Sequence, residues 1–193
     1  MARLPEVYKL NTHELPRRAG EMKEYELDIA VPEKVGVDLI SIPVGEIIEV
    51  DARLESVTEG ILLTAEIFAV AKGECTRCLD PVAIEINRKI QELYNYAVKT
   101  ERPKKKRNDD EIDLDIEDEL MMQGDVMDLE GPIRDAIVLA LPINPLCSDD
   151  CPGLCPECGG KWAELASDHA HEVIDARWAG LAGLDLPEAD FKN

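Results

Sequence analysis

Hydrophobic and polar residues alternate with a period of two through most of the segment from Tyr25 to about Val98. Such alternation places successive side chains on opposite faces of a β-strand. Turn-forming residues separate the alternating runs, among them Thr58-Glu59-Gly60 between two long ones. The pattern predicts antiparallel strands over residues 26–29, 47–54, 61–71 and 82–93. We therefore expect residues 1–98 to form an antiparallel twisted sheet or a half-open barrel.

Residues 99–130 break this pattern with two runs of charge. Basic residues come first, and 11 carboxylates without a basic residue follow between Asn108 and Gly131. Such a run is typical of a solvated linker. Within it, residues 112–116 alternate well enough to add a short edge strand, whose charges would protect that edge against aggregation.

A helical period appears in residues 131–193. Pro132 suits the first turn of a helix, and Pro142 ends it. A second helix is expected to begin near Asp175. The fold class is then α+β, with one helix closing the core of the sheet and a zinc-knuckle segment at the C-terminus. The apolar face of the closing helix consists of Ile133, Ala136, Ile137, Ala140 and Leu141.

The composition narrows the classes of function. The chain has 45% hydrophobic residues, enough for a core, but only 4% aromatic residues, so the core is expected to be aliphatic. The formal net charge of −20 opposes wrapping on nucleic acid, whose affinity comes largely from lysine and arginine. The beginning of the chain has no apolar signal region, so we expect a cytoplasmic protein that spans no membrane.

Six cysteines in such a chain predict metal binding rather than disulfides, because the cytosol keeps thiols reduced. The pairs Cys75/Cys78 and Cys155/Cys158 are each separated by two residues, a spacing that turns both thiolates toward one ion. The second pair, with a proline inside and a glycine after it, is typical of a zinc knuckle. The favoured scheme has two tetrahedral zinc sites. The first uses Cys75, Cys78, Cys147 and Cys151, and the second uses Cys155, Cys158, His169 and His171.

Two alternatives to this scheme stay open. A zinc ribbon would join Cys75 and Cys78 with Cys155 and Cys158 at a single ion and leave Cys147 and Cys151 unused. The other alternative is a set of reduced, metal-free thiols. In the two-site scheme each ion has four protein ligands and no position for an activated water, so both ions would be structural.

No catalytic residue is nominated. The sequence has no phosphate-binding loop, no nucleophile elbow and no His-Glu-x-x-His helix. A possible RNA contact lies in the basic run of the linker, although such runs are usually solvated loops. This run consists of Lys99, Arg102, Lys104, Lys105, Lys106 and Arg107.

Several motifs together resemble the bacterial YceD family, a resemblance that extends from the N-terminal region to about residue 184. The most specific is the Cys-x-Arg-Cys element on Cys75, Arg77 and Cys78. Many relatives carry Cys-x-Cys where this chain has His169-Ala170-His171, a change that keeps metal-ligand chemistry. The other motifs are Val57-Thr58-Glu59-Gly60, the helix end from Leu139-Ala140-Leu141-Pro142 to Leu146-Cys147, Gly153-Leu154-Cys155-Pro156-Glu157-Cys158-Gly159 and Asp175-Ala176-Arg177-Trp178-Ala179-Gly180-Leu181.

The family is described as large ribosomal RNA subunit accumulation proteins, so the resemblance implies a part in the maturation or stability of large-subunit ribosomal RNA. We expect a non-enzymatic ribosome-biogenesis factor that binds a large-subunit ribosomal protein or a pre-ribosomal RNA particle, and no small-molecule substrate. Because the surface is acidic, a basic protein is favoured over naked RNA. The alternatives are a metal-assisted RNA-processing enzyme and a zinc-dependent adaptor in transcription or translation.

Overall fold

A computed structural model describes residues 6–96, 119–171 and 177. The predicted basic run at 99–107, the edge strand at 112–116 and nearly all of the helix expected near Asp175 lie outside these residues. The chain divides into two compact units, Met1–Cys151 and Pro152–Asn193.

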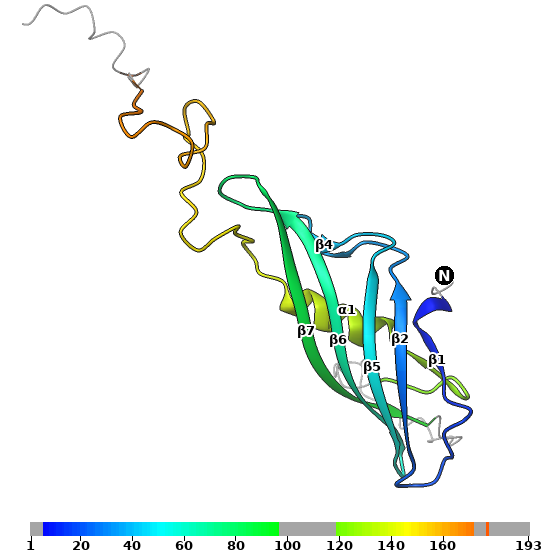
Figure 1. The fold of residues 1–193 in the computed structure, drawn as a ribbon. Helices are drawn as coiled ribbons and strands as arrows, with labels where there is room; N and C mark the ends of the chain where they lie inside the picture. The colour runs from blue at the N-terminus through cyan, green and yellow to red at the C-terminus, as the bar shows by residue number, and fades with distance from the viewer. Residues whose placement is uncertain (1–5, 97–118, 172–176, 178–193) are drawn as a thin grey trace, which may run out of the picture. The chain divides into compact units, whose positions relative to one another are not determined.

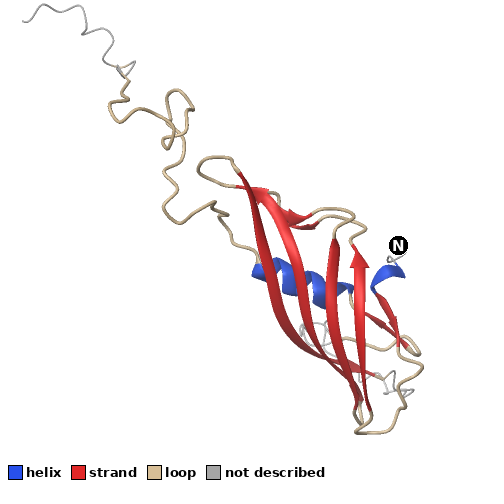
Figure 2. Cartoon of the chain, viewed as in Figure 1, coloured by secondary structure: helices blue, strands red, loops and turns tan. Residues whose placement is uncertain are grey.

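The first unit contains one large antiparallel sheet and one small one. The large sheet has the order β2-β5-β6-β4-β3, with β7 paired to β6, and it is open rather than closed into a barrel. The small sheet pairs β1 with β8. Figures 1 and 2 show the long strands side by side with the helix against one face. The strands are β1 (Lys9–Asn11), β2 (Met22–Ala30), β3 (Val35–Gly36), β4 (Ile40–Ile42), β5 (Ile47–Ser56), β6 (Gly60–Glu74), β7 (Pro81–Asn95) and β8 (Val126–Asp128).

The four long strands are those that the period of two predicts, and the antiparallel arrangement is confirmed. Each extends beyond the predicted bounds, because the alternation continues into the turns. Gly60 allows β7 to approach the start of β6 closely: a Cβ there would lie 2.0 Å from the carbonyl oxygen of Tyr94. Only glycine permits this close approach of two strands.

The helices are the 3₁₀ helix η1 (Glu6–Tyr8) and the α-helix α1 (Glu130–Ala140). Helix α1 begins two residues before Pro132, which still lies in the first turn, where its missing N–H costs no hydrogen bond. Leu141 is extended, as expected for a residue before proline, so the helix ends where Pro142 predicts. The single core-closing helix is therefore present.

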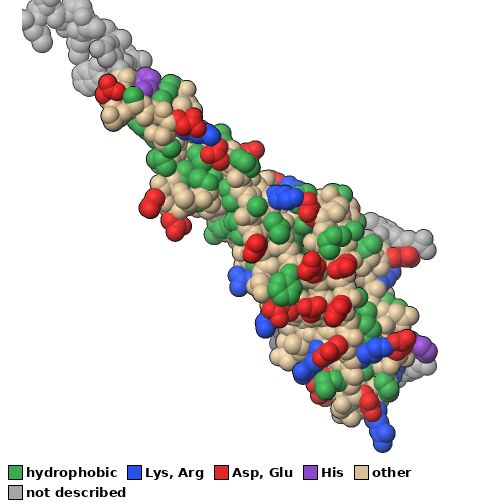
Figure 3. All heavy atoms as spheres, in the orientation of Figure 1, with side chains coloured by type: hydrophobic (Ala, Val, Ile, Leu, Met, Phe, Trp, Pro, Cys, Tyr) green, Lys and Arg blue, Asp and Glu red, His purple; other side chains and the backbone are tan. Residues whose placement is uncertain are grey.

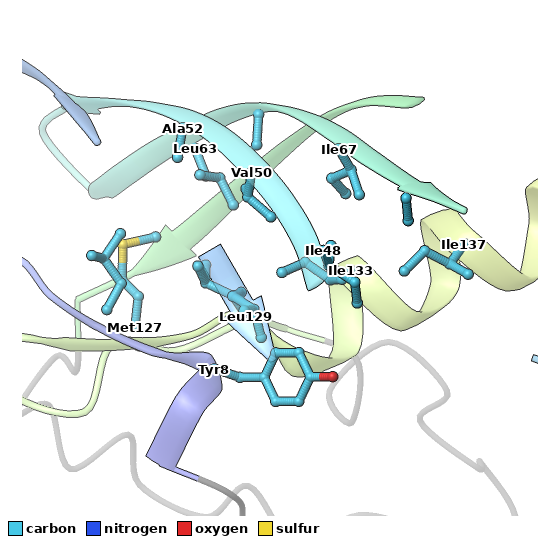
Figure 4. Packing of buried hydrophobic residues seen from close by; sticks show 14 of the residues in the cluster. Tyr8, Ile48, Val50, Ala52, Leu63, Ile67, Met127, Leu129, Ile133 and Ile137 are labelled. Carbon is cyan, nitrogen blue, oxygen red and sulfur yellow. The ribbon is translucent and has the colours of Figure 1, made fainter. Parts of the chain in front are cut away.

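The core lies between the large sheet and α1. Alternate residues of β5 and β6 point inward, and Ile133 and Ile137 of α1 meet them (Figure 4). Met127 of β8 and Leu129 complete this layer, so residues between 119 and 130 contribute to the core. The buried side chains are mostly aliphatic, as the composition predicts. The opposite face of the sheet carries the polar half of the alternation and no helix of the described residues.

Candidate metal centres

The four-cysteine group consists of Cys75, Cys78, Cys147 and Cys151, all within the first compact unit. Cys75 and Cys78 lie in the turn between β6 and β7, and the other two follow α1. Their four sulfur atoms all lie within 4.8 Å of one another. Cys75, Cys78 and Cys151 are buried and Cys147 is exposed. None of the six cysteines of the chain forms a disulfide.

The spacing of these sulfur atoms fits one tetrahedral zinc ion. With a Zn–S bond of about 2.3 Å, the edge of a regular tetrahedron of sulfurs is about 3.8 Å. The Sγ atoms of Cys75 and Cys151 are 3.8 Å apart, and those of Cys78 and Cys147 are 3.5 Å apart. These distances are too long for a disulfide, whose S–S bond is about 2.05 Å. The group could therefore hold one metal ion.

The turn around Cys75 has the hydrogen bonds of a metal-binding knuckle. The Leu79 N–H donates to the Cys75 carbonyl at 2.9 Å, and the Cys75 N–H donates to the Asp80 carbonyl at 2.7 Å. Leu79 has φ of 62°, a left-handed conformation that residues other than glycine rarely adopt. This turn directs both sulfurs of the pair toward the same point.

The electrostatics of this group favour a bound cation. Burial alone would raise the pKa of the Cys75 thiol, but backbone N–H groups of Cys78, Arg77 and Cys147 lower that pKa to about 6. For Cys78 the Asp80 N–H lowers the pKa, yet burial and the neighbouring thiols outweigh it, so the pKa is raised. One thiolate is thus favoured and further ones are opposed. A divalent cation removes this opposition, because its charge offsets that of several thiolates.

Arg77 ties the two parts of the four-cysteine group together. Its guanidinium donates to the Cys151 carbonyl at 2.9 Å and to the Asp149 carbonyl at 3.4 Å. The backbone N–H and the hydroxyl of Thr76 both donate to the Pro145 carbonyl. The segment after α1 is therefore held to the β6–β7 turn by hydrogen bonds as well as by the cysteines. Sequence reasoning singled out Arg77 in a motif but gave it no role, because its partners are backbone carbonyls.

The cysteine–histidine group consists of Cys155, Cys158, His169 and His171, all within the second compact unit. Its four ligand atoms also lie within 4.8 Å of one another. The Cys158 Sγ is 3.5 Å from the His169 Nε2, close to the edge of about 3.6 Å expected for a mixed sulfur and nitrogen site. The two histidine Nε2 atoms are 2.9 Å apart. A zinc ion would separate them by about half an ångström more, since its tetrahedral N···N edge is about 3.4 Å.

The second group repeats the knuckle of the first. The Gly159 N–H donates to the Cys155 carbonyl at 2.9 Å, and the Cys155 N–H donates to the Gly160 carbonyl at 2.7 Å. These are the same two bonds, in the same order, as at Cys75. The left-handed position is a glycine here, with φ of 69°. The Cys158 and Glu157 N–H groups lower the pKa of the Cys155 thiol, as the corresponding groups do at Cys75.

The surroundings of the second group are more open. Cys155 is buried, Cys158 and His171 are exposed and His169 is half-buried. His169 makes an edge-to-face contact with Trp162, with ring centroids 5.5 Å apart. A short bridge between Leu154 and Lys161 and a hydrogen bond from the Trp162 N–H to the Gly153 carbonyl close the loop around the knuckle. The loop itself positions all four ligands.

Comparison with known proteins identifies the family. The YceD family, described as "Large ribosomal RNA subunit accumulation protein YceD", matches residues 63–185, a range that contains both ligand groups. The chain belongs to this family. The family name implies a role in the accumulation of large-subunit ribosomal RNA.

Particular relatives occur in mycobacteria. An uncharacterized protein of Mycobacterium tuberculosis (strain ATCC 25618 / H37Rv) is 40% identical over 178 residues, which are 91% of this chain and 80% of the relative. An uncharacterized protein of Mycobacterium leprae (strain TN) is 31% identical over 174 residues, 90% of this chain and 76% of the relative. No solved structure matches the chain significantly. No helix of the described residues has the length and apolar character needed to cross a membrane.

Proposed function

We propose that this protein is a cytoplasmic, non-enzymatic ribosome-biogenesis factor. It supports accumulation or maturation of large-subunit ribosomal RNA by binding a ribosomal protein or a pre-ribosomal particle. Membership of the YceD family carries this proposal. The net charge of −20 supports a basic protein as the direct partner, because most of the surface repels phosphate. The basic run from Lys99 to Arg107 is the segment that we assign to any local RNA contact.

Two structural zinc ions are part of this proposal. The ligands are Cys75, Cys78, Cys147 and Cys151 for one ion and Cys155, Cys158, His169 and His171 for the other. Zinc is favoured over other metals because thiolate and imidazole donors in sets of four are its usual structural ligands. Four protein ligands leave no position for an activated water, which supports a structural role over metal-assisted RNA processing.

The zinc ions also define the domain organisation that we propose. Residues 1–98 supply the long strands, residues 99–130 connect them to the helix and also provide β8, and residues 131–193 contain the core-closing helix and the ligand-rich segment. The first ion joins the turn of the sheet domain to the segment after the helix, since Cys75 and Cys151 are 76 positions apart in the chain. The second ion closes only the C-terminal loop, where Cys158 and His169 are 11 positions apart.

Co-sedimentation of the protein with large-subunit precursors tests this function. A tagged chain expressed from its own locus is expected in fractions that contain large-subunit precursors, and rising salt is expected to release it, because charge attraction contributes to binding. A strain that lacks the gene should contain less mature large-subunit ribosomal RNA and normal small-subunit RNA. Association with RNA polymerase instead would favour the adaptor alternative. Zinc-dependent cleavage of precursor RNA by the purified protein would favour the enzyme.

A further inference from the structure

The outer face of the large sheet, on the side opposite α1, contains a cavity of about 600 Å³. Its apolar lining includes Ile47, Phe68 and Val70 from β5 and β6. Ile47 and Val70 are 45% and 39% exposed, although equivalent positions on the inner face are fully covered. Exposed apolar side chains gathered around a cavity indicate an interaction site more often than a free surface.

Carboxylates border this apolar patch. Glu46, Glu49 and Glu85 line the cavity itself. Glu46 pairs with Lys72 at 2.5 Å, but Glu49 and Glu85 have no ion pair with any residue that the structure describes. Figure 3 shows this face, with acidic side chains gathered over the middle of the sheet and hydrophobic side chains beside them. A partner with positive charge is therefore the one that the cavity would attract.

The carboxylates continue across the sheet in direct register. Asp28 lies opposite Glu49, Glu26 lies opposite Asp51, and Asp51 lies opposite Glu66. Like charges directly opposite one another destabilise a sheet. Of these five, only Glu66 forms an ion pair within the described residues, with Lys89 at 3.2 Å. These like-charge pairs do not stabilise the sheet, and they leave the other four carboxylates of this face available to cationic groups of a partner.

We propose that the outer face of the sheet, centred on Phe68 and Glu49, binds a lysine- and arginine-rich segment of a protein partner. Aliphatic parts of such a segment cover Ile47, Phe68 and Val70, and its cationic groups meet the carboxylates and the face of the Phe68 ring. RNA is disfavoured because its phosphates would face unpaired carboxylates. A second copy of this chain is disfavoured because it would present the same charge. The inference rests on the proposed function in one respect: it takes ribosomal proteins as the source of the basic segment.

The test uses an array of overlapping peptides of about 15 residues, a length sufficient for one extended segment. The peptides cover the large-subunit ribosomal proteins, the small-subunit ribosomal proteins and a set of acidic cytoplasmic proteins. The full-length, zinc-loaded chain is expected to bind peptides that combine lysine or arginine with aliphatic residues. The strongest of these peptides is then titrated in solution by fluorescence anisotropy.

Variants decide whether this face is the binding site. Glu49→Gln combined with Asp51→Asn should lower the affinity for the peptide about tenfold, because two cationic contacts are lost. The same variant should melt at the same temperature or higher, since it relieves like-charge repulsion, and a residue needed only for folding would not behave so. Phe68→Ala should lower the affinity while leaving its dependence on salt unchanged. The matched control is Glu33→Gln with Asp38→Asn, which changes the net charge equally at exposed residues outside the sheet face and should leave affinity unchanged.

Each outcome bears on the inference separately from the proposed function. Failure to bind any basic peptide, an equal loss in the control variant, or competition by single-stranded RNA for the wild-type chain would overturn the inference. Binding of basic peptides from both ribosomal subunits alike supports the inference and weakens the proposed function. Co-sedimentation with large-subunit precursors that the Glu49→Gln, Asp51→Asn variant retains in full would leave the proposed function in place and overturn the role of this face in it.

Discussion

The four-cysteine group and the cysteine–histidine group use the same knuckle to hold very different lengths of chain. In the first, Cys78 and Cys147 are 69 positions apart, and Cys75 and Cys151 are 76 apart. In the second, Cys158 and His169 are separated by 11 positions. An ion in the first group would close a loop that contains β7, β8 and α1. An ion in the second would close only its own loop.

This difference decides what each ion would do for the protein. The entropic cost of closing a loop rises with its length, so cross-linking the longer loop restricts the unfolded chain more. The first group is also better shielded, with Cys75, Cys78 and Cys151 at 0%, 7% and 4% exposure. Two ligands of the second group are exposed. We therefore expect metal at the first group to be coupled to folding of the whole first unit, and metal at the second to order a local segment.

The largest effect is expected for Cys75→Ser. Loss of this ligand should reduce the zinc content from two ions to one and lower the free energy of unfolding of the first unit by about 4 kcal/mol or more, because loss of a structural metal is among the largest effects of a single substitution. Elemental analysis of protein purified without chelator gives the zinc content, and denaturant titration followed by circular dichroism gives the stability. If the variant keeps both ions, the four-cysteine group does not bind zinc as proposed.

His171→Ala should have a local effect. One zinc ion is again lost, but the denaturant midpoint of the sheet should stay within experimental error of the wild type, because no residue of the sheet belongs to this group. His171→Cys serves as the matched control, since a thiolate keeps a ligand at this position and should restore the second ion. A His171→Ala variant whose sheet unfolds at much lower denaturant would show that the two groups are not independent. Equal zinc content in the wild type, this variant and Cys75→Ser would remove the metal assignment altogether.

High pH should weaken the first unit through Tyr94. Burial, and then the charges of Asp128 and Glu92, raise the pKa of this phenol, whose hydroxyl donates to the Asp128 carbonyl at 2.6 Å. Because the folded-state pKa lies above the ordinary value of about 10, the unfolded chain loses the proton first, and stability should fall as pH rises above 10. Tyr94→Phe should cost about 1 kcal/mol at neutral pH for the lost hydrogen bond and should flatten the alkaline decline.

The measurement for Tyr94 is the free energy of unfolding between about pH 8 and 11. Burial also raises the pKa of Tyr8. This residue should therefore cause part of the alkaline loss of stability in the wild type, and the part that is left in Tyr94→Phe. An alkaline decline of the same steepness in Tyr94→Phe and wild type would show that another group causes it. The zinc content of the cysteine–histidine group, measured over the same pH range, shows whether the second unit changes with pH independently of the first. This group contains no tyrosine.

The sequence predicted features that repeat along the chain and missed those that depend on pairing between distant residues. The long strands have enough alternating residues to be recognised, and Pro142 marks the end of α1. Strands β1 and β8 have three residues each and exist because Lys9–Asn11 meets Val126–Asp128. A run of three residues has no detectable period, so only the tertiary pairing reveals it.

The candidate metal ligands could be predicted only in part from the sequence, because their local spacing is visible there and their tertiary pairing is not. Spacing shows that Cys75 and Cys78, or Cys155 and Cys158, can face one ion, because a knuckle is a local structure. Which pairs share an ion depends on where the turn between β6 and β7 lies relative to the chain after α1, and spacing does not contain this. In the sequence, Glu49 and Asp51 are simply polar positions of the alternating run at 47–54. Their significance depends on the register that places them opposite other carboxylates.

The smallest effects are expected from substitutions at the left-handed position that follows the second cysteine of each knuckle. Leu79 and Gly159 occupy the same left-handed position, with φ of 62° and 69°. A residue with a Cβ is disfavoured there by about 1–2 kcal/mol, although glycine also costs entropy, so Leu79→Gly should stabilise the first unit by about 0.5–1 kcal/mol.

Gly159→Ala meets no atom within 4 Å of its new Cβ, so its effect is confined to the backbone. It should weaken zinc binding at the second group about fivefold, measured by competition with a chromophoric chelator. The two substitutions should have effects of opposite sign, because one removes a Cβ from the left-handed backbone conformation and the other adds a Cβ to it. Loss of zinc affinity at the first group in Leu79→Gly would instead show that the exposed Leu79 side chain, and not the turn, supports that group.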